Sequence, residues 1–156
     1  MITILRTSSE NPDFRELVKQ LDAELAVRNG GLHSFYSQFN KLDRIKHVLV
    51  AYDDGEPSAC GAIKEFAPDT MEIKRMYVRP EKRKRGIAYM ILTGLDNWSL
   101  ELSYKKTILE TSLKQQEAIG LYKKKGYTLI PNFGQYKGVD NSICFEKLLI
   151  AQSFIP

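Results

Sequence analysis

The chain has 156 residues, an apolar fraction of 43% and a formal net charge of +4, values that predict one compact domain over residues 1–156 and exclude a wholly disordered chain. The positive excess is small and mostly local, whereas a dedicated nucleic-acid-binding protein spreads more charge over one face. No apolar run approaches the ~20 residues of a membrane helix, and the first residues lack the pattern of a secretory signal.

Apolar spacing and turn residues predict elements in the order β α α β β β α β α β β. Helical spacing begins after Asn11, a good N-cap that precedes Pro12, and Asp54-Gly55 is a strong hairpin turn. The elements are expected at residues 2–6 (strand), 11–31 (helix), 33–42 (helix), 47–66 (hairpin), 70–79 (strand), 86–104 (helix), 106–112 (strand), 115–126 (helix), 127–130 (strand) and 141–150 (strand).

The fold class follows from this order. The helix at 86–104 lies between two expected strands, which favours a parallel pair, because such a crossover needs a helix. The remaining strands are expected to pair as antiparallel hairpins. The sequence therefore predicts the α/β class of the α+β type, with a mixed, mostly antiparallel central sheet of about six or seven strands and helices on both faces.

The two cysteines, Cys60 and Cys144, both lie in apolar, strand-like stretches. Neither has the spacing to histidines that a metal site or thiol catalysis needs, so buried thiols in a reducing cytoplasm are the simpler interpretation. We therefore expect a cytoplasmic protein that binds no metal.

The stretch VRPEKRKRGIA, residues 78–88, places five cations before a glycine. Pro80 stops a strand, a basic loop follows, and a helix begins near Gly86. The first turn of a helix leaves four backbone N–H groups without helical partners, and its dipole favours an anion by ~0.3–1 kcal/mol. Gly86 and the small Ala88 would let a ligand approach this backbone, while the cations add charge-assisted hydrogen bonds. One interpretation is a phosphate or pyrophosphate cradle.

Two other interpretations of residues 78–88 stay open from the residues alone. A basic run is most often a solvated face, and it could also contact the phosphate backbone of a nucleic acid. The chain lacks both the dinucleotide signature Gly-x-Gly-x-x-Gly and the P-loop signature that ends in Gly-Lys-Ser/Thr. These two nucleotide-binding classes are therefore excluded by motif.

The stretch resembles motif A of the GNAT superfamily of N-acetyltransferases, Arg/Gln-x-x-Gly-x-Gly/Ala, at Arg83, Gly86 and Ala88. Residues 115–127 resemble motif B, Asn-x-x-Ala-x-x-Leu-Tyr-x-Lys-x-Gly-Phe/Tyr, with Gln115 in the place of Asn. The element order agrees across nearly the whole chain. The resemblance implies a GNAT fold and an acetyl-coenzyme-A-dependent N-acetyltransferase. The matching motif B positions are Ala118, Leu121, Tyr122, Lys124, Gly126 and Tyr127.

The resemblance also implies a site for acetyl-coenzyme A, the acyl donor. Backbone N–H groups from 85 to 88 would hold the pyrophosphate, and Arg83 with its basic neighbours would help to hold the phosphates. The backbone of 76–78 would bind the pantetheine arm, and Gln115 would lie near the cofactor as the Asn of the family does. The implied cofactor-binding residues are Met76, Tyr77, Val78, Arg83, Lys84, Arg85, Gly86, Ile87, Ala88, Gln115 and Tyr122.

Acetyl transfer needs a neutral amine, a hydrogen-bond donor to the developing oxyanion and a proton for the departing thiolate. Tyr122 occupies the motif B position at which many family members place a general acid; the alternative is a tyrosine that only packs against the sheet. Glu72 and Glu110 are the candidate bases, with water as a third alternative. Glu110 lies in an apolar strand, where a carboxylate is unusual, whereas Glu72 alternates with Lys74 as an exposed edge residue would.

The acceptor would be the primary amine of a small molecule or a peptide. We expect acetyl-coenzyme A and this amine as partners, without nucleic acid or membrane, and homodimers are frequent in families of this kind. Two alternatives are a coenzyme-A-binding member without catalysis and a nucleic-acid-binding module. The resemblance points to aromatic wall residues at Phe35, Tyr36, Phe39, Phe133 and Tyr136, with Asp43 and Asp140 as partners for the amine.

Overall fold

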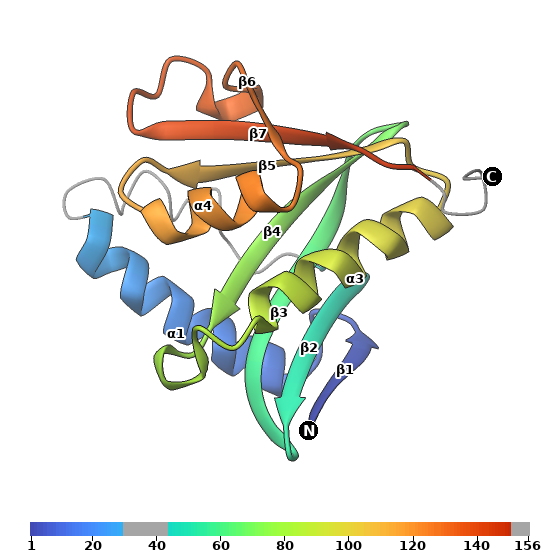
Figure 1. Cartoon of the computed structure of the whole chain (residues 1–156), viewed down its shortest axis with the longest axis vertical. Coiled ribbons are helices and arrows are strands. Elements are labelled where there is room, and N and C mark those ends of the chain that lie inside the picture. The colour runs from blue at the N-terminus through green and yellow to red at the C-terminus, as the bar shows by residue number, and fades with distance from the viewer. Residues whose placement is uncertain (30–43, 151–156) are drawn as a thin grey trace. The chain divides into compact units, whose positions relative to one another are not determined.

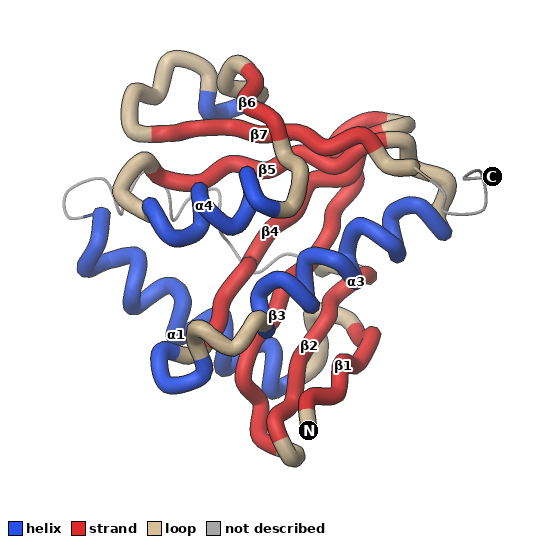
Figure 2. The backbone as a smooth tube through the Cα atoms, viewed as in Figure 1, coloured by secondary structure: helices blue, strands red, loops and turns tan. Residues whose placement is uncertain are grey.

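The computed structural model describes residues 1–29 and 44–150, and the elements follow the predicted order along the chain (Figures 1 and 2). The second helix predicted at 33–42 lies outside the described residues. The strands are β1 (Ile2–Thr7), β2 (His47–Asp53), β3 (Glu56–Ala67), β4 (Thr70–Val78), β5 (Lys106–Ser112), β6 (Thr128–Ile130) and β7 (Ser142–Leu148), and the helices are α1 (Pro12–Asn29), α3 (Ile87–Glu101) and α4 (Gln116–Lys124).

The strands form one seven-stranded sheet in the order β1-β2-β3-β4-β5-β7-β6. Strands β1 and β2, β2 and β3, β5 and β7, and β6 and β7 pair antiparallel. Strand β4 pairs parallel with β5, and helix α3 connects them along the chain. The prediction of a mixed, mostly antiparallel sheet with one helix-linked parallel pair is confirmed.

The chain divides into two compact units. The first comprises Met1–Lys64 and Lys74–Leu95, and the second comprises Glu65–Ile73 and Asp96–Pro156. The division falls inside β3, β4 and α3, so each of these elements contributes residues to both units. The basic stretch belongs to the first unit, whereas Glu72, Glu110 and Tyr122 belong to the second.

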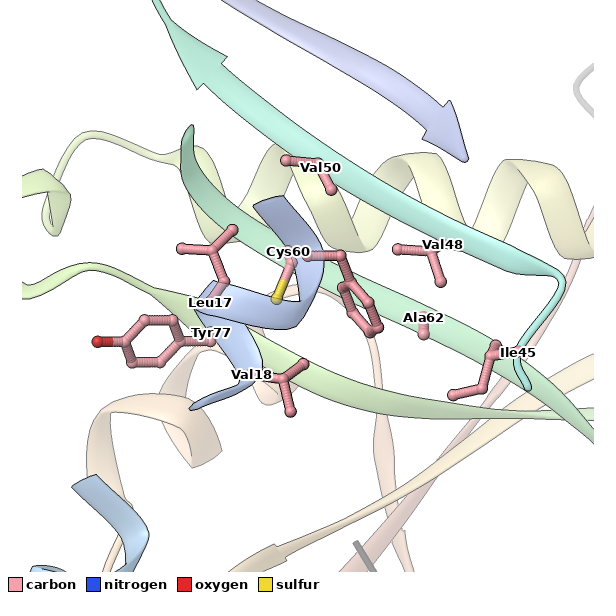
Figure 3. Close-up of a cluster of buried hydrophobic side chains, with 9 residues drawn as sticks. Leu17, Val18, Ile45, Val48, Val50, Cys60, Ala62 and Tyr77 are labelled. Carbon is pink, nitrogen blue, oxygen red and sulfur yellow. The ribbon is translucent and has the colours of Figure 1, made fainter. Parts of the chain in front are cut away.

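In the first unit, helices pack on both faces of the sheet. Successive β2 residues point to opposite faces, so alternate residues share one face. Val48 and Val50 join a buried cluster with Leu17 and Val18 of α1 (Figure 3). On the other face, a Cβ atom built on Gly94 of α3 would lie 2.7 Å from the side chain of Leu49. Because β2 is buried on both faces, its sequence is a continuous apolar run and does not alternate between apolar and polar residues.

Local signals place several boundaries where they were expected. The Asn11 side-chain oxygen accepts hydrogen bonds from the backbone N–H groups of Asp13 (2.8 Å) and Phe14 (3.2 Å), which confirms it as the N-cap of α1. Asp54 and Gly55 have φ angles of 49° and 86°, the left-handed pair that a tight hairpin turn requires.

The end of α3 differs from its prediction. The helix ends at Glu101, not at Tyr104. Ser103 has a φ of 71°, and the N–H groups of Ser103 and Tyr104 donate to the carbonyls of Leu100 and Ser99 at 2.9 and 3.0 Å. This is a Schellman cap with serine at the position that usually carries glycine, so the sequence offered no stop signal there.

Candidate active site

The basic stretch forms a short loop between β4 and α3 in the first unit. A single 3-10 turn at Pro80–Lys82 follows the strand, and the N–H of Arg83 donates to the carbonyl of Pro80 at 3.3 Å. Lys84 and Gly86 then have φ angles of 65° and 78°. Two left-handed residues in so short a segment turn the backbone sharply into the helix, which is why a glycine is favoured here.

Gly86 is the residue from which α3 starts. Its carbonyl accepts the first helical hydrogen bond, from the N–H of Met90 at 3.1 Å. A Cβ atom at Gly86 would have no neighbour within 4 Å, so the space beside this backbone is open. Ile87 is fully buried and anchors the helix start. The loop therefore has the open backbone and the helix N-terminus that a pyrophosphate group needs.

Arg83 makes contacts within the protein. Its Nε donates to the carbonyl of Val78 at 2.8 Å, and its Nη2 donates to Glu24 Oε1 of α1 at 2.7 Å. The guanidinium carbon also lies 5.7 Å from the centroid of the Tyr77 ring. The motif A arginine thus links the end of β4, the loop and helix α1.

Two other cations of the stretch have carboxylate partners at the β2–β3 hairpin. Lys82 Nζ lies 3.0 Å from Asp53 Oδ2 and 2.8 Å from Glu56 Oε1, and Arg85 Nη1 lies 2.9 Å from the same Asp53 oxygen. The two cations lower the pKa of Asp53, chiefly through the Lys82 hydrogen bond. Among the described residues, Lys84 has no such partner and is exposed.

The backbone of β4 is irregular just before the predicted pantetheine segment. Arg75 has a φ of 61°, which is uncommon for any residue other than glycine. Its carbonyl accepts a hydrogen bond from Cys60 Sγ at 3.3 Å. The side chain of Tyr77 joins the cluster beneath α1, and the Met76 sulfur lies on the side of Gly61 that also faces Ile91. The backbone of Met76–Val78 therefore follows directly after the left-handed residue Arg75.

The two candidate bases lie on one face of the sheet in the second unit. Glu72 of β4 is in register with Ile108 of β5, and Glu110 is two residues further along β5. Residues two apart point to the same face, so both carboxylates share it. Burial and then the charges of Glu110 and Glu72 raise the pKa of Tyr136.

The expectation for Glu72 as an exposed edge residue is wrong. The residue is 9% exposed, because β4 lies between β3 and β5 and is not an edge strand. Glu110 is half-buried, and its Oε2 accepts a hydrogen bond from Ser142 Oγ of β7 at 2.7 Å. The alternation of Glu72 with Lys74 could not reveal this burial. The residues of one strand do not show whether that strand lies at the edge or in the interior of the sheet.

Tyr122 lies on the inner side of α4 and is 5% exposed. Its ring packs near Tyr127 and Phe145, at centroid distances of 5.9 and 6.2 Å. Burial, and then the charge of Glu110, raises the pKa of the phenol above its ordinary value. Tyr122 therefore stays protonated at neutral pH, as a proton donor must.

Gln115 caps the start of α4 with its backbone rather than its side chain. Its N–H donates to the carbonyl of Ser112 at 2.9 Å, and its carbonyl accepts from the N–H of Ile119 at 3.1 Å. The Gln115 side-chain oxygen accepts from Thr111 Oγ1 at 3.0 Å. This contact holds the Gln115 side chain, which is longer than the Asn of motif B, beside the end of β5.

The candidate acceptor residues fall into two groups. Phe35, Tyr36, Phe39 and Asp43 lie outside the described residues. Phe133 and Tyr136 belong to the segment before β7, and their rings meet edge to face at 5.8 Å. The ring of Phe66, which the sequence did not point out, meets Phe133 at 5.2 Å. Asp140 is exposed.

Sequence reasoning also missed the partners of these residues. Glu24 and Asp53 hold the basic loop, and Ser142 holds Glu110. Each partner lies about 30 to 60 residues from the group it contacts, as the separations of 59, 32 and 32 residues record. No local pattern encodes such contacts.

The sequence model of the acetyltransferase (GNAT) family matches residues 10–127. The chain belongs to this family. An IAA acetyltransferase of Azospirillum brasilense is 30% identical over 153 residues, which cover 95% of this chain and 98% of the relative. The uncharacterized N-acetyltransferase YjgM of Escherichia coli K12 is 26% identical over 132 residues, or 78% of each chain. The predicted family and the prediction of an acetyltransferase are confirmed.

Solved structures share the fold over nearly all of the chain. A candidate acyl-CoA N-acyltransferase from Klebsiella pneumoniae is 26% identical, with a TM-score of 0.81 over 96% of this chain and 99% of that one. A PaiA N-acetyltransferase from Thermoplasma acidophilum, solved in complex with coenzyme A, is 17% identical, with a TM-score of 0.70 over 95% and 99%. The GNAT fold predicted from the two motifs is confirmed.

Residues 1–29 and 44–150 also bear on two other kinds of site. No helix in these ranges is long and apolar enough to cross a bilayer. No group of three or more His, Cys, Asp or Glu side chains in the same ranges could hold a metal ion.

Proposed function

We propose that this GNAT-family chain is an acetyl-coenzyme-A-dependent N-acetyltransferase that acts as a single domain. It transfers the acetyl group directly to a primary amine, of a small molecule or a peptide, in a ternary complex. The observation that carries the proposal is the loop before α3, where Gly86 has a φ of 78° and open space beside its backbone. This feature lies within the residues that match the family.

Coenzyme A would be held mainly by backbone groups. The N–H groups of residues 85 to 88, at the start of α3, would bind the pyrophosphate, and exposed Lys84 would add a charge-assisted contact. The backbone of Met76–Val78, at the end of β4, would bind the pantetheine arm. Gln115 and Tyr122 are further candidate cofactor-binding residues. The shared fold of a structure solved with coenzyme A supports coenzyme A as the ligand.

The ion pairs of the loop argue against a nucleic-acid partner. Lys82, Arg83 and Arg85 each contact a carboxylate of this chain. Partner carboxylates offset much of the positive charge that a nucleic acid would meet, and such charge supplies most of non-specific binding. A compact ligand that contacts backbone N–H groups fits this loop better than an extended phosphate backbone.

The proposed mechanism has three parts: removal of a proton from the amine, stabilisation of the charge on the carbonyl oxygen, and donation of a proton to the departing sulfur. Acetyl-coenzyme A supplies an acetyl thioester when bound. A carboxylate, directly or through water, takes a proton from the incoming amine, which must be neutral to attack. The N–H of Val78 is the candidate donor to the carbonyl oxygen as it gains charge. The Tyr122 hydroxyl gives its proton to the departing sulfur.

Glu110 is the favoured base, with Glu72 as the alternative. Acid and base act on the same carbon, so the two groups must lie near each other. The charge of Glu110 raises the pKa of Tyr122, and Ser142 Oγ holds the Glu110 carboxylate at 2.7 Å. Glu72 shares the face with Glu110 but is more deeply buried. Glu110→Gln is therefore expected to lower turnover more than Glu72→Gln.

A thiol-release assay with acetyl-coenzyme A and a panel of amines tests the function. We expect thiol release that depends on an amine, with intersecting initial-rate lines when both substrates are varied. Parallel lines or an acetylated enzyme would instead indicate a covalent intermediate and contradict direct transfer. Thermal stabilisation by coenzyme A without turnover on any amine would support a binding member that does not catalyse.

A further inference from the structure

We propose that Glu24 of α1 is a positioning residue for coenzyme A binding, because it holds Arg83 in the arrangement that shapes the β4–α3 loop. The inference rests on the proposed function and deepens its binding step. It assigns Arg83 to the support of the loop rather than to direct contact with phosphate.

Three contacts hold the Arg83 side chain. Nη2 lies 2.7 Å from Glu24 Oε1, Nε lies 2.8 Å from the Val78 carbonyl, and the guanidinium stacks near the Tyr77 ring. A guanidinium presents its donors in a fixed planar fork, so two bonds at this distance set its orientation. The Glu24 and Arg83 side chains are 26% and 27% exposed, so solvent weakens this pair less than a fully exposed one.

The Val78 contact closes the loop on itself. Val78 ends β4, and Arg83 follows the 3-10 turn, so the bond joins the two ends of this turn. A second contact to α1 lies nearby, since Arg79 Nε donates to Gln20 Oε1 at 3.3 Å. Gln20 and Glu24 are four residues apart and therefore lie on one side of the helix. Helix α1 thus contacts the loop at Arg79, its first residue, and at Arg83, which directly precedes Lys84.

The support acts on the backbone that follows Arg83. Lys84 and Gly86 have φ angles of 65° and 78°, and a left-handed conformation at Lys84 is costly for a residue with a side chain. An anchored Arg83 keeps this backbone in place before the ligand arrives. Less conformational entropy is then lost when the N–H groups bind the pyrophosphate.

The first experiment measures the affinity for coenzyme A by titration calorimetry in Glu24→Ala. The dissociation constant is expected to rise on the order of threefold to tenfold, because the loop must be ordered on binding. Glu24→Gln retains an acceptor oxygen and should lie between Glu24→Ala and the parent. Glu16→Ala is the matched control, because Glu16 is an exposed carboxylate on the same helix.

The opposite result would overturn the proposal. If Arg83 were a phosphate ligand, Glu24 would compete with the phosphate, and Glu24→Ala would bind coenzyme A more tightly. An unchanged affinity would also contradict a positioning role.

A second arm separates positioning from general stability. In an Arg83→Met background, Glu24→Ala should have no further effect on affinity, because the contact through which Glu24 would act on the loop is gone. An equal loss in both backgrounds would mean that Glu24 acts through something other than Arg83. In steady state, the KM for acetyl-coenzyme A should rise in Glu24→Ala while kcat and the KM for the amine stay near the parent values.

A third arm needs no ligand. Hydrogen exchange over residues 79–88 should be faster in Glu24→Ala than in the parent, and unchanged in Glu16→Ala. Equal exchange in all three proteins would refute the positioning role whether or not the parent binds coenzyme A. Binding of coenzyme A by the parent separately tests the proposed function.

Discussion

At the scale of single residues, Tyr122 shows how burial keeps a side chain in one protonation state. A free phenol has a pKa of about 10, and burial and then the charge of Glu110 raise the pKa of Tyr122 above this value. The proton is therefore present at neutral pH. The same shift makes the phenol a weaker acid, and because an alkyl thiol has a pKa of about 8.5, proton transfer from Tyr122 to the departing thiolate costs more than it would from an ordinary phenol.

We predict that Tyr122→Phe lowers kcat about tenfold or more, with little change in the affinity for coenzyme A, because the substitution removes only the proton donor. Steady-state kinetics and calorimetry measure the two quantities. Tyr104→Phe removes a hydroxyl that bonds to Glu65 at an exposed position and should leave kcat unchanged. An unchanged kcat in Tyr122→Phe would remove Tyr122 from the mechanism.

At the scale of elements, the joint between β4 and α3 depends on a left-handed glycine. Gly86→Ala is expected to lower the free energy of unfolding by about 1 kcal/mol, since a Cβ atom is unfavourable at a φ of 78° even where space is open. Affinity for coenzyme A should fall as well, because the loop backbone would shift. Urea unfolding and calorimetry measure the two effects.

Gly120 of α4 is the matched control. It also has open space for a Cβ atom, but its φ is not positive, and it lies inside a helix. Gly120→Ala should therefore raise the free energy of unfolding by roughly 0.5–1 kcal/mol. Two substitutions of the same chemistry would then have opposite signs. Equal effects at both positions would contradict the left-handed requirement at Gly86.

Elements with local signals were predicted well. The Asn11 cap, the Asp54-Gly55 turn and the end of the strand before Pro80 depend on neighbouring residues. The local sequence was therefore sufficient to predict them. The end of α3 was missed because Ser103 adopts the left-handed conformation without being glycine. Of the candidate site, the loop and Tyr122 could be found from two motifs. Glu24 and Ser142 could not, because their partners are distant in sequence.

At the scale of the whole molecule, contacts between distant segments hold the second unit together. Asp96 of α3 has a side chain that is 6% exposed. It accepts hydrogen bonds from Tyr127 Oη at 2.6 Å and Thr107 Oγ1 at 3.2 Å, and Lys147 Nζ lies 3.3 Å away. Burial and the Asp96 charge raise the pKa of Tyr127, so its hydroxyl remains a donor.

We predict that Asp96→Asn lowers the free energy of unfolding by about 2–4 kcal/mol, because it removes the charge that offsets Lys147 and disturbs a buried network. Denaturant unfolding measures the change. Asp140→Asn, an exposed substitution of the same kind, should stay within about 0.5 kcal/mol of the parent. A loss below about 1 kcal/mol in Asp96→Asn would show that the network is weakly coupled to folding.

The sequence by itself determined the order of elements, the family and the loop that a phosphate group would approach. These follow from spacing, turn residues and short motifs, all of which act over a few residues. Only the tertiary structure decided that Glu72 is buried, that Glu72 and Glu110 share one face, and that Arg83 binds Glu24. Burial and pairing depend on strand order and on contacts across tens of residues, and a single sequence does not carry that information locally.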